Sequence, residues 1–96
     1  MMANVLTVLK IIPGDTDFDR EVFVSNVFKG LCEDNNITYL KYEEEPVAYG
    51  LVAILAYIKN PDTEDGADDI NALQETLEGM DDLSTIEIQV QQLTDH

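Results

Sequence analysis

The chain has 96 residues, of which 45% are hydrophobic and 26% are charged, which is the size and composition of one globular domain. Its 20 Asp and Glu against 5 Lys and Arg give a formal net charge of −15. This charge argues against sequence-independent binding to nucleic acid, which depends on basic side chains, and against docking to anionic lipid. We therefore expect residues 1–96 to form a single domain with no direct nucleic-acid or membrane contacts.

Side chains that could carry metal-dependent or acid–base chemistry are scarce. Cys32 is the single cysteine and His96, the last residue, the single histidine, so we expect no intramolecular disulfide, no zinc site and no internal base for a nucleophile. The longest apolar run, residues 51–58, is far shorter than the ~20 residues that span a bilayer, and the first residues lack signal-peptide features. We expect a cytoplasmic protein that is not an enzyme and that uses no cofactor or metal.

The first third of the chain predicts a strand and a helix. Val, Ile and Leu dominate residues 3–12, which precede the turn signal Pro13-Gly14. Thr16 or Asp17 is placed to cap a helix, and Asn35-Asn36 is expected to end it, since Asn tolerates the left-handed conformation. Helical spacing predicts a buried stripe on this helix that consists of Val24, Val27, Phe28 and Leu31.

The remaining elements follow as two strands, a helix and a strand. Residues 37–43 predict a second strand that Glu44-Glu45-Pro46 interrupts, and residues 47–59 predict a third. After a polar turn over 60–66, a second helix is indicated by Ile70, Leu73, Leu77 and Met80. Apolar residues then alternate with polar ones in a last strand, at Ile86, Ile88 and Val90.

The order β-α-β-β-α-β in a chain of this length predicts an α+β, ferredoxin-like sandwich, with two helices on one face of a four-stranded antiparallel sheet. In this fold the first and third strands are central, and both are apolar without interruption here. Leu6 and Val8 are expected on the open face of the sheet. We expect Lys10, Lys41 and Gln89 to lie across that face and cover it.

Two acidic segments could suggest chemistry. In residues 62–69, alignment of Gly66 with the sixth position of a calcium-binding EF-hand loop puts Pro61 first and Ala72 last, which violates the ligand pattern. An acidic helix N-terminus is the better interpretation. Glu43-Glu44-Glu45 could serve acid–base catalysis, but a catalytic pair needs a desolvated carboxyl group, so we expect a solvated turn.

The segment around Tyr49-Gly50 is the most informative. An aromatic residue before Gly, just after Pro46, predicts a large ring at a turn or bulge, because Gly permits backbone conformations that other residues avoid. Two roles are open for the ring: it caps the end of the core, or it is an anchor presented to a partner.

The run from Glu43 to Leu51, Glu-Glu-Glu-Pro-Val-Ala-Tyr-Gly-Leu, resembles the central signature of translation elongation factor 1-beta. In that family, acidic or polar residues, a proline and an aromatic-Gly pair precede an apolar strand. The rest agrees in order, with a Pro-containing turn after the first strand, an Asp-rich helix start over 15–19, the acidic segment 62–69 and a final alternating strand. The resemblance covers residues 3–93, and the length is similar to that of the short archaeal form.

The resemblance implies a guanine nucleotide exchange factor for elongation factor 1-alpha, the GTPase that delivers aminoacyl-tRNA to the ribosome. In this family the aromatic residue of the aromatic-Gly pair enters an apolar pocket of the GTPase, and Tyr49 has that position here. The partner-binding residues that the resemblance implies are therefore Tyr49, Gly50, Pro46, Val47 and Leu51.

The chain departs from the family at two places. Eukaryotic members have a penultimate Lys that reaches the magnesium site of the GTPase, where this chain has Asp95, and basic residues where it has Val52 and Ala53. The lysine-driven step therefore cannot be carried over. A competing interpretation is a ferredoxin-like regulatory module that dimerises through its open sheet face and binds a small ligand, and weak self-association stays open in either case.

Overall fold

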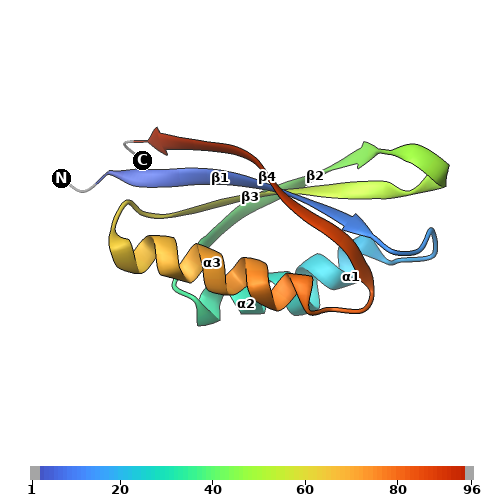
Figure 1. The fold of residues 1–96 in the computed structure, drawn as a ribbon, viewed down its shortest axis with the longest axis horizontal. Helices are drawn as coiled ribbons and strands as arrows, with labels where there is room; N and C mark the ends of the chain where they lie inside the picture. The colour runs from blue at the N-terminus through green and yellow to red at the C-terminus, as the bar shows by residue number, and fades with distance from the viewer. Residues whose placement is uncertain (1–2, 95–96) are drawn as a thin grey trace.

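The computed structural model describes residues 3–94. The elements in chain order are β1 (Asn4–Pro13), α1 (Arg20–Phe23), the π-helical segment η1 (Val24–Phe28), α2 (Lys29–Asp34), β2 (Thr38–Pro46), the short 3-10 turn η2 (Ala48–Gly50), β3 (Val52–Pro61), α3 (Glu64–Glu78) and β4 (Leu83–Thr94). Because α1, η1 and α2 follow one another without a gap, they form one irregular helix. The predicted α+β, ferredoxin-like order is confirmed (Figure 1).

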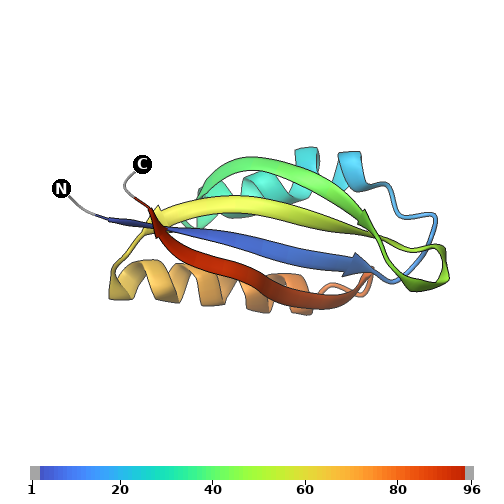
Figure 2. The same cartoon turned by 90° about the horizontal axis from the view of Figure 1, so that it is seen from above.

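The four strands form one antiparallel sheet in the order β2-β3-β1-β4. The two uninterrupted apolar strands, β1 and β3, are central, as their sequences predict, and β2 and β4 are the edges. Both helices cover the same face of the sheet (Figure 1). Seen from above, the strands run along the long axis of the molecule (Figure 2). The molecule measures 44 × 21 × 19 Å.

The core lies between the sheet and the two helices. In the β1–β3 register Leu9 pairs with Ala56, and Ile11 with Ile54, and all four side chains are buried on the helix side. Alternation along each strand explains why every second residue joins the core. The helices contribute the large buried side chains Phe28, Leu73 and Leu77.

Asp19 caps the first helix, where Thr16 or Asp17 was predicted. The Asp19 carboxylate accepts a hydrogen bond from the Val22 amide at 3.1 Å, and the helix begins at Arg20. The preceding residues make a turn of their own, in which the Asp15 carboxylate accepts from the Asp17 amide at 3.0 Å. The prediction is wrong because this turn delays the first helical residue.

The buried stripe of the first helix also differs from the prediction. Val24 and Phe28 are buried and Leu31 is half-buried, but Val27 is exposed and Phe23 is buried in its place. The cause is η1, because a π-helical turn spaces its hydrogen bonds five residues apart instead of four. Phe28 thus follows Phe23 on the buried side, and their ring centroids lie 6.3 Å apart.

Two strand boundaries need correction. Glu44-Glu45-Pro46 continues β2 instead of interrupting it, with Pro46 paired to Val52. Residues 47–51 are therefore a turn, and β3 starts five residues later than predicted.

The pairing of β4 with β1 contains a bulge. Val8 pairs with Val90 and Leu9 with Ile88, so Gln89 has no partner residue in β1.

The bulge at Gln89 overturns the simple alternation predicted for β4. An extra residue in one strand reverses the faces beyond it. Ile88 therefore lies on the helix side and Val90 on the open side, and both remain exposed.

The open sheet face carries Leu6 and Val8, as predicted. Across the strand pairs, Val8 lies beside Tyr57 of β3. The Lys41 Nζ lies 4.7 Å from the Tyr57 ring centroid, and the Lys10 Nζ lies 3.6 Å from a Glu45 carboxylate oxygen.

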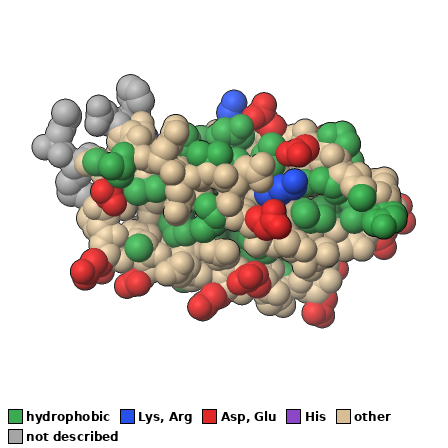
Figure 3. All heavy atoms as spheres, turned by 45° about the horizontal axis from the view of Figure 1, so that its top comes forward, with side chains coloured by type: hydrophobic (Ala, Val, Ile, Leu, Met, Phe, Trp, Pro, Cys, Tyr) green, Lys and Arg blue, Asp and Glu red, His purple; other side chains and the backbone are tan. Residues whose placement is uncertain are grey.

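These long side chains cover the apolar rows, and Val8 is only 5% exposed. Figure 3 shows apolar surface on this side interrupted by basic and acidic groups. Lys10 and Lys41 thus lie where the sequence predicts, whereas Gln89 is an exposed bulge residue.

Candidate functional site

The β2–β3 connection is a tight hairpin turn over residues 47–51. The Val47 amide donates to the Leu51 carbonyl oxygen at 2.9 Å, and the Leu51 amide donates to the Ala48 carbonyl oxygen at 3.3 Å. These bonds close the turn directly after the Pro46–Val52 strand pair. The turn projects at the end of the molecule opposite the two chain termini (Figure 1).

Two consecutive residues of this turn have a left-handed backbone. Tyr49 has φ 62° and ψ 28°, and Gly50 has φ 77°. Gly adopts this conformation without a steric penalty, whereas a residue with a Cβ incurs about 1–2 kcal/mol. Strained backbone of this kind clusters at functional sites, so the turn is a candidate site on its backbone alone.

Tyr49 is 94% exposed. The structure therefore excludes the interpretation in which the ring caps the core. Pro46 and Gly50 are also exposed, and Val47 and Leu51 are half-buried beneath the tip. Four residues of the predicted partner-binding set thus lie on the turn, and Pro46 is the last residue of β2 beside it. Their role in binding stays a prediction.

The base of the hairpin is held by all three glutamates of the run. Glu43 accepts a hydrogen bond from the Tyr57 hydroxyl at 2.6 Å. Glu44 accepts from the Arg20 Nε at 2.6 Å, on the helix side of the sheet. Glu45 lies 3.6 Å from Lys10 on the open side.

These glutamates lie in β2 and not in a turn, so that part of the prediction is wrong, whereas Glu43 and Glu44 are exposed to solvent, as predicted. Arg20, Lys10 and Tyr57 are supporting residues that the sequence did not reveal, because their partners are 14 to 35 positions away along the chain. The sequence did offer one signal for these contacts. If residues 43–45 continue the strand, successive side chains point to opposite faces of the sheet, so Glu44 contacts different partners from Glu43 and Glu45.

The Tyr57–Glu43 contact has an electrostatic consequence. The hydrogen bond to Glu43 raises the pKa of the Tyr57 hydroxyl, and desolvation and the Glu43 charge act in the same direction. The neutral phenol is the form that donates this bond. The Tyr57 hydroxyl therefore stays in the protonated form that donates this bond at neutral pH.

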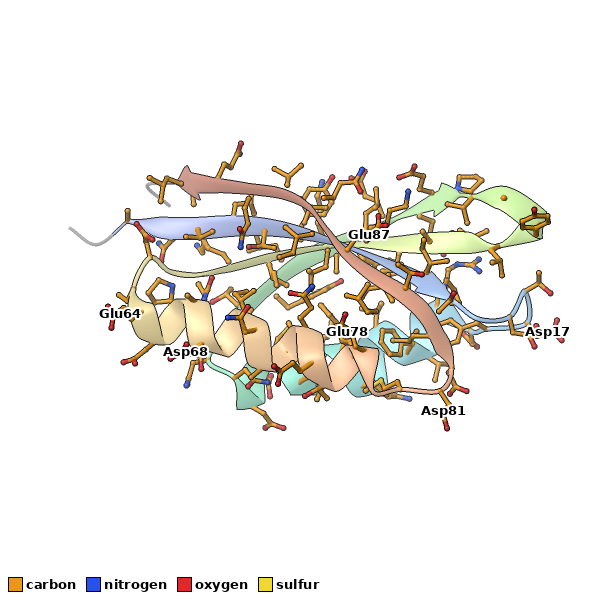
Figure 4. The ribbon with its side chains drawn as sticks, in the orientation of Figure 1. Asp17, Glu64, Asp68, Glu78, Asp81 and Glu87 are labelled. Atoms are coloured by element: carbon orange, nitrogen blue, oxygen red, sulfur yellow. The ribbon has the colours of Figure 1, made fainter. Side chains whose placement is uncertain are left out.

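Two acidic loops lie at the same end of the molecule as the hairpin. The β1–α1 loop comes close to the turn, since a Cβ built on Gly50 would lie 3.6 Å from the Thr16 methyl group. The Gly14 amide donates to the Asp82 carbonyl oxygen at 2.9 Å and joins this loop to the α3–β4 loop. Asp17 and Asp81 lie near this end, whereas Glu64 and Asp68 lie at the other (Figure 4).

The acidic end shows no metal-binding geometry. Within residues 3–94, no three side chains of His, Cys, Asp or Glu are grouped so that they could share a metal ion. In the same range no helix is long and apolar enough to cross a membrane. The candidate site is therefore an exposed aromatic turn with two acidic loops at the same end of the molecule.

The fold and this turn define a class: a small ferredoxin-like domain that presents an aromatic hairpin. The model of the EF-1 guanine nucleotide exchange domain matches residues 6–93. The chain is 33% identical to elongation factor 1-beta of Ignicoccus hospitalis over 92% of its length and 89% of the relative. It is 31% identical to that of Methanothermobacter thermautotrophicus, over 91% and 92%. The chain therefore belongs to the EF-1 guanine nucleotide exchange domain family.

Solved structures show the same fold at low sequence identity. The C-terminal domain of the MgtC protein from Mycobacterium tuberculosis has a TM-score of 0.62 at 11% identity and covers all of this chain and 90% of that one. The ACT domain of GTP pyrophosphokinase from Chlorobium tepidum has a TM-score of 0.58 at 14% identity, with 88% and 97% covered. These likenesses support the ferredoxin-like architecture alone.

Proposed function

We propose that this chain is the nucleotide exchange factor of the elongation factor 1-alpha GTPase, and that Tyr49 is the side chain that enters the GTPase. Membership of the EF-1 guanine nucleotide exchange domain family supports a role in nucleotide exchange during translation elongation. The observation that carries the assignment to Tyr49 is its 94% exposure on a closed, left-handed turn.

The turn suits an anchor because its conformation is set before binding. The two hydrogen bonds across residues 47–51 and the three glutamate contacts at the hairpin base restrict the tip. An anchor that is already ordered loses less conformational entropy on binding. Aromatic side chains that fill a partner's pocket commonly carry a large share of the binding free energy.

Exchange requires no covalent chemistry. The factor binds the empty GTPase more tightly than the GDP-bound form, and by thermodynamic reciprocity it weakens GDP binding by the same factor. Insertion of a ring near the nucleotide site is one way to create this difference. The GTPase conformation that accepts the ring then differs from the conformation that binds GDP, so each ligand favours its own conformation. The proposal therefore assigns Tyr49 to binding and not to catalysis.

The two departures from the family pattern bear on the mechanism. Asp95 lies outside the described residues. Val52 begins β3 at the base of the turn, and Ala53 is buried in the sheet. Neither Val52 nor Ala53 supplies a basic group, so the proposed mechanism depends on the hairpin and not on basic side chains at these two positions.

Release of a fluorescent GDP analogue (mantGDP) from the cognate GTPase tests this function. The chain should accelerate release, and Tyr49→Ala should abolish the acceleration and weaken complex formation by about 2 kcal/mol or more. Leu40→Ala is the matched control, because Leu40 is also a large exposed apolar residue, but it lies near the start of β2, away from the turn, and is 45% exposed.

Circular dichroism should show that both variants remain folded. A loss of less than about 0.5 kcal/mol for Tyr49→Ala, measured by calorimetry, would remove Tyr49 from the anchor role. Unchanged nucleotide release with the wild-type chain, together with ligand-dependent dimerisation, would instead support the regulatory-module interpretation.

A further inference from the structure

A pocket of about 200 Å³ lies between the sheet and the start of α3. Val5, Asn60 and Gln91 line it from three neighbouring strands, and the β3–α3 turn and the first turns of α3 line it from the other side. The bulge at Gln89 helps to form the pocket, because it places Gln91 on the helix side of the sheet. The start of α3 and the turn that carries Tyr49 are at opposite ends of the molecule (Figure 1), so the pocket is separate from the proposed exchange function.

Asn60 is the buried polar residue of this pocket. Its side chain is 4% exposed, and its Nδ2 donates to the Gly66 carbonyl oxygen at 2.7 Å. This bond fixes the orientation of the amide group, because a carbonyl oxygen can only accept. Within residues 3–94 the Asn60 Oδ1 has no hydrogen-bond partner. A buried carbonyl oxygen without a donor destabilises the fold, so a group that donates to Oδ1 would bind here favourably.

The start of a helix commonly binds anions through its free N–H groups, but the N–H groups that belong to this pocket are already bonded. Pro61 has no N–H group. The other lining residues of the turn and helix start each donate their amide to a protein oxygen at 2.9 to 3.0 Å, namely Asp62, Thr63, Gly66 and Ala67. The first turn of α3 also carries two acidic residues, which offset the positive end of the helix dipole. The pocket is therefore unsuited to an anion.

We propose that this pocket binds a primary alkylammonium ion, such as one end of a free aliphatic diamine. An ammonium group has three donors and no acceptor, so it suits a pocket that offers the Asn60 Oδ1 and the carboxylate of Asp62. The alkyl chain would pack against the apolar part of the lining, which consists mainly of Val5, Ala67 and Ile70. A pocket of this volume holds a small organic molecule.

A metal ion and a neutral donor both fit this pocket less well. Hard cations such as Ca²⁺ take six to eight oxygen ligands, whereas Asp62 is the one carboxylate that lines the pocket, beside apolar side chains. In the part of the chain that the structure describes, no three side chains of His, Cys, Asp or Glu are grouped for a metal ion. A neutral alcohol could donate to Asn60 but would gain nothing from the charge of Asp62.

Calorimetric titration of the whole chain with n-butylammonium chloride tests the proposal. The matched control ion is n-butyltrimethylammonium at equal ionic strength, which has the same charge and alkyl chain but no N–H donor. We expect saturable binding of n-butylammonium and at least about tenfold weaker binding of the control ion, because only the former can donate to the Asn60 Oδ1. In ¹H–¹⁵N NMR spectra, the side-chain amide signals of Asn60 should shift during the first titration.

Two variants of α3 locate the binding site without a change of charge. Ala67 and Ala72 are both exposed on this helix, but only Ala67 lines the pocket. Ala67→Leu should weaken n-butylammonium binding at least about tenfold, because the larger side chain fills the pocket. Ala72→Leu should leave the affinity unchanged. Leucine is a good helix former, and circular dichroism should show that both variants remain folded.

Three outcomes would overturn the proposal. The first is no saturable binding of n-butylammonium, and the second is equal affinity for the two ions, which would show attraction to the negative charge alone. The third is an equal effect of the two leucine variants. NMR gives a further check, because sodium chloride at equal ionic strength should not reproduce the shift of the Asn60 signals. If it did, the proposal would also be wrong.

Discussion

Arg20 and Glu44 connect the first helix to the presented hairpin. The Arg20 Nε lies 2.6 Å from the Glu44 carboxylate, across 24 positions of sequence. The contact fixes the first turn of α1 against β2, two residues before the strand ends at Pro46. The side chains are 26% and 45% exposed, so water and salt screen the pair.

A double-mutant cycle should measure this pair directly. With Arg20→Ala, Glu44→Ala and the double variant, we expect a coupling free energy of about 0.5 kcal/mol, which falls at high salt, because exposed ion pairs contribute little. Urea unfolding at 0.05 and 1 M NaCl gives the values. Coupling that is absent at low salt would show that the pair does not brace the hairpin.

Substitution of Tyr49 by Gly should separate stability from function. Because Tyr49 occupies a left-handed backbone conformation, Tyr49→Gly should stabilise the chain by about 0.5–1 kcal/mol while it abolishes nucleotide exchange. Thermal or urea unfolding and mantGDP release measure the two effects. A destabilised variant would mean that the turn does not store strain at this residue.

Two glycines in helices should respond to alanine with opposite signs. A Cβ on Gly66 would clash with the Pro61 carbonyl oxygen, so Gly66→Ala should destabilise the chain by about 3 kcal/mol or more. Gly30 in α2 has no heavy atom within 4 Å of such a Cβ, and Gly30→Ala should stabilise by about 0.5–1 kcal/mol. Urea unfolding of both variants checks the pair, and similar effects would contradict the close packing of Pro61 on α3.

The thiol of Cys32 should be inert in the native chain. Burial raises its pKa from an ordinary value near 9 to about 12, and the charge of Glu33 adds to the shift. Because the folded state favours the neutral thiol, this contribution to stability is complete below about pH 9 and declines as the pH rises toward 12. At pH 8 iodoacetamide should therefore alkylate Cys32 only when the chain unfolds, at a rate that rises with urea concentration. Fast alkylation of Cys32 without urea would show that the thiol is not buried.

The position of the acidic residues, and not only the net charge, should affect association with the GTPase. Asp17→Asn with Asp81→Asn and Glu64→Gln with Asp68→Asn each remove two negative charges, at opposite ends of the molecule (Figure 4). If the acidic hairpin end steers binding to a basic surface, the first pair should lower the association rate more, with a difference that disappears at high salt. Stopped-flow mixing with the GTPase measures the association rates of the two double variants. Equal association rates would show that the acidic residues at the hairpin end have no special role in steering.

The architecture followed from local patterns that the structure confirms. Uninterrupted apolar residues in β1 and β3 predicted the two central strands, because a central strand is shielded on both sides. The Tyr49-Gly50 pair predicted a turn or a bulge, because the left-handed backbone that Gly permits is a property of one or two residues.

Tertiary structure decided what those patterns do not encode. The partners of the three glutamates and the bulge at Gln89 depend on where distant segments meet. The Asp19 cap and the π-helical turn beside Phe23 are local, but helical periodicity alone does not place them. The physical reason is that hydrophobic periodicity records which side of an element avoids water, whereas an ion pair or a register shift depends on which other segment lies there. The sequence by itself thus indicated that a ring stands at a turn or a bulge, and only the packed sheet determined that it faces outward at the end of a hairpin.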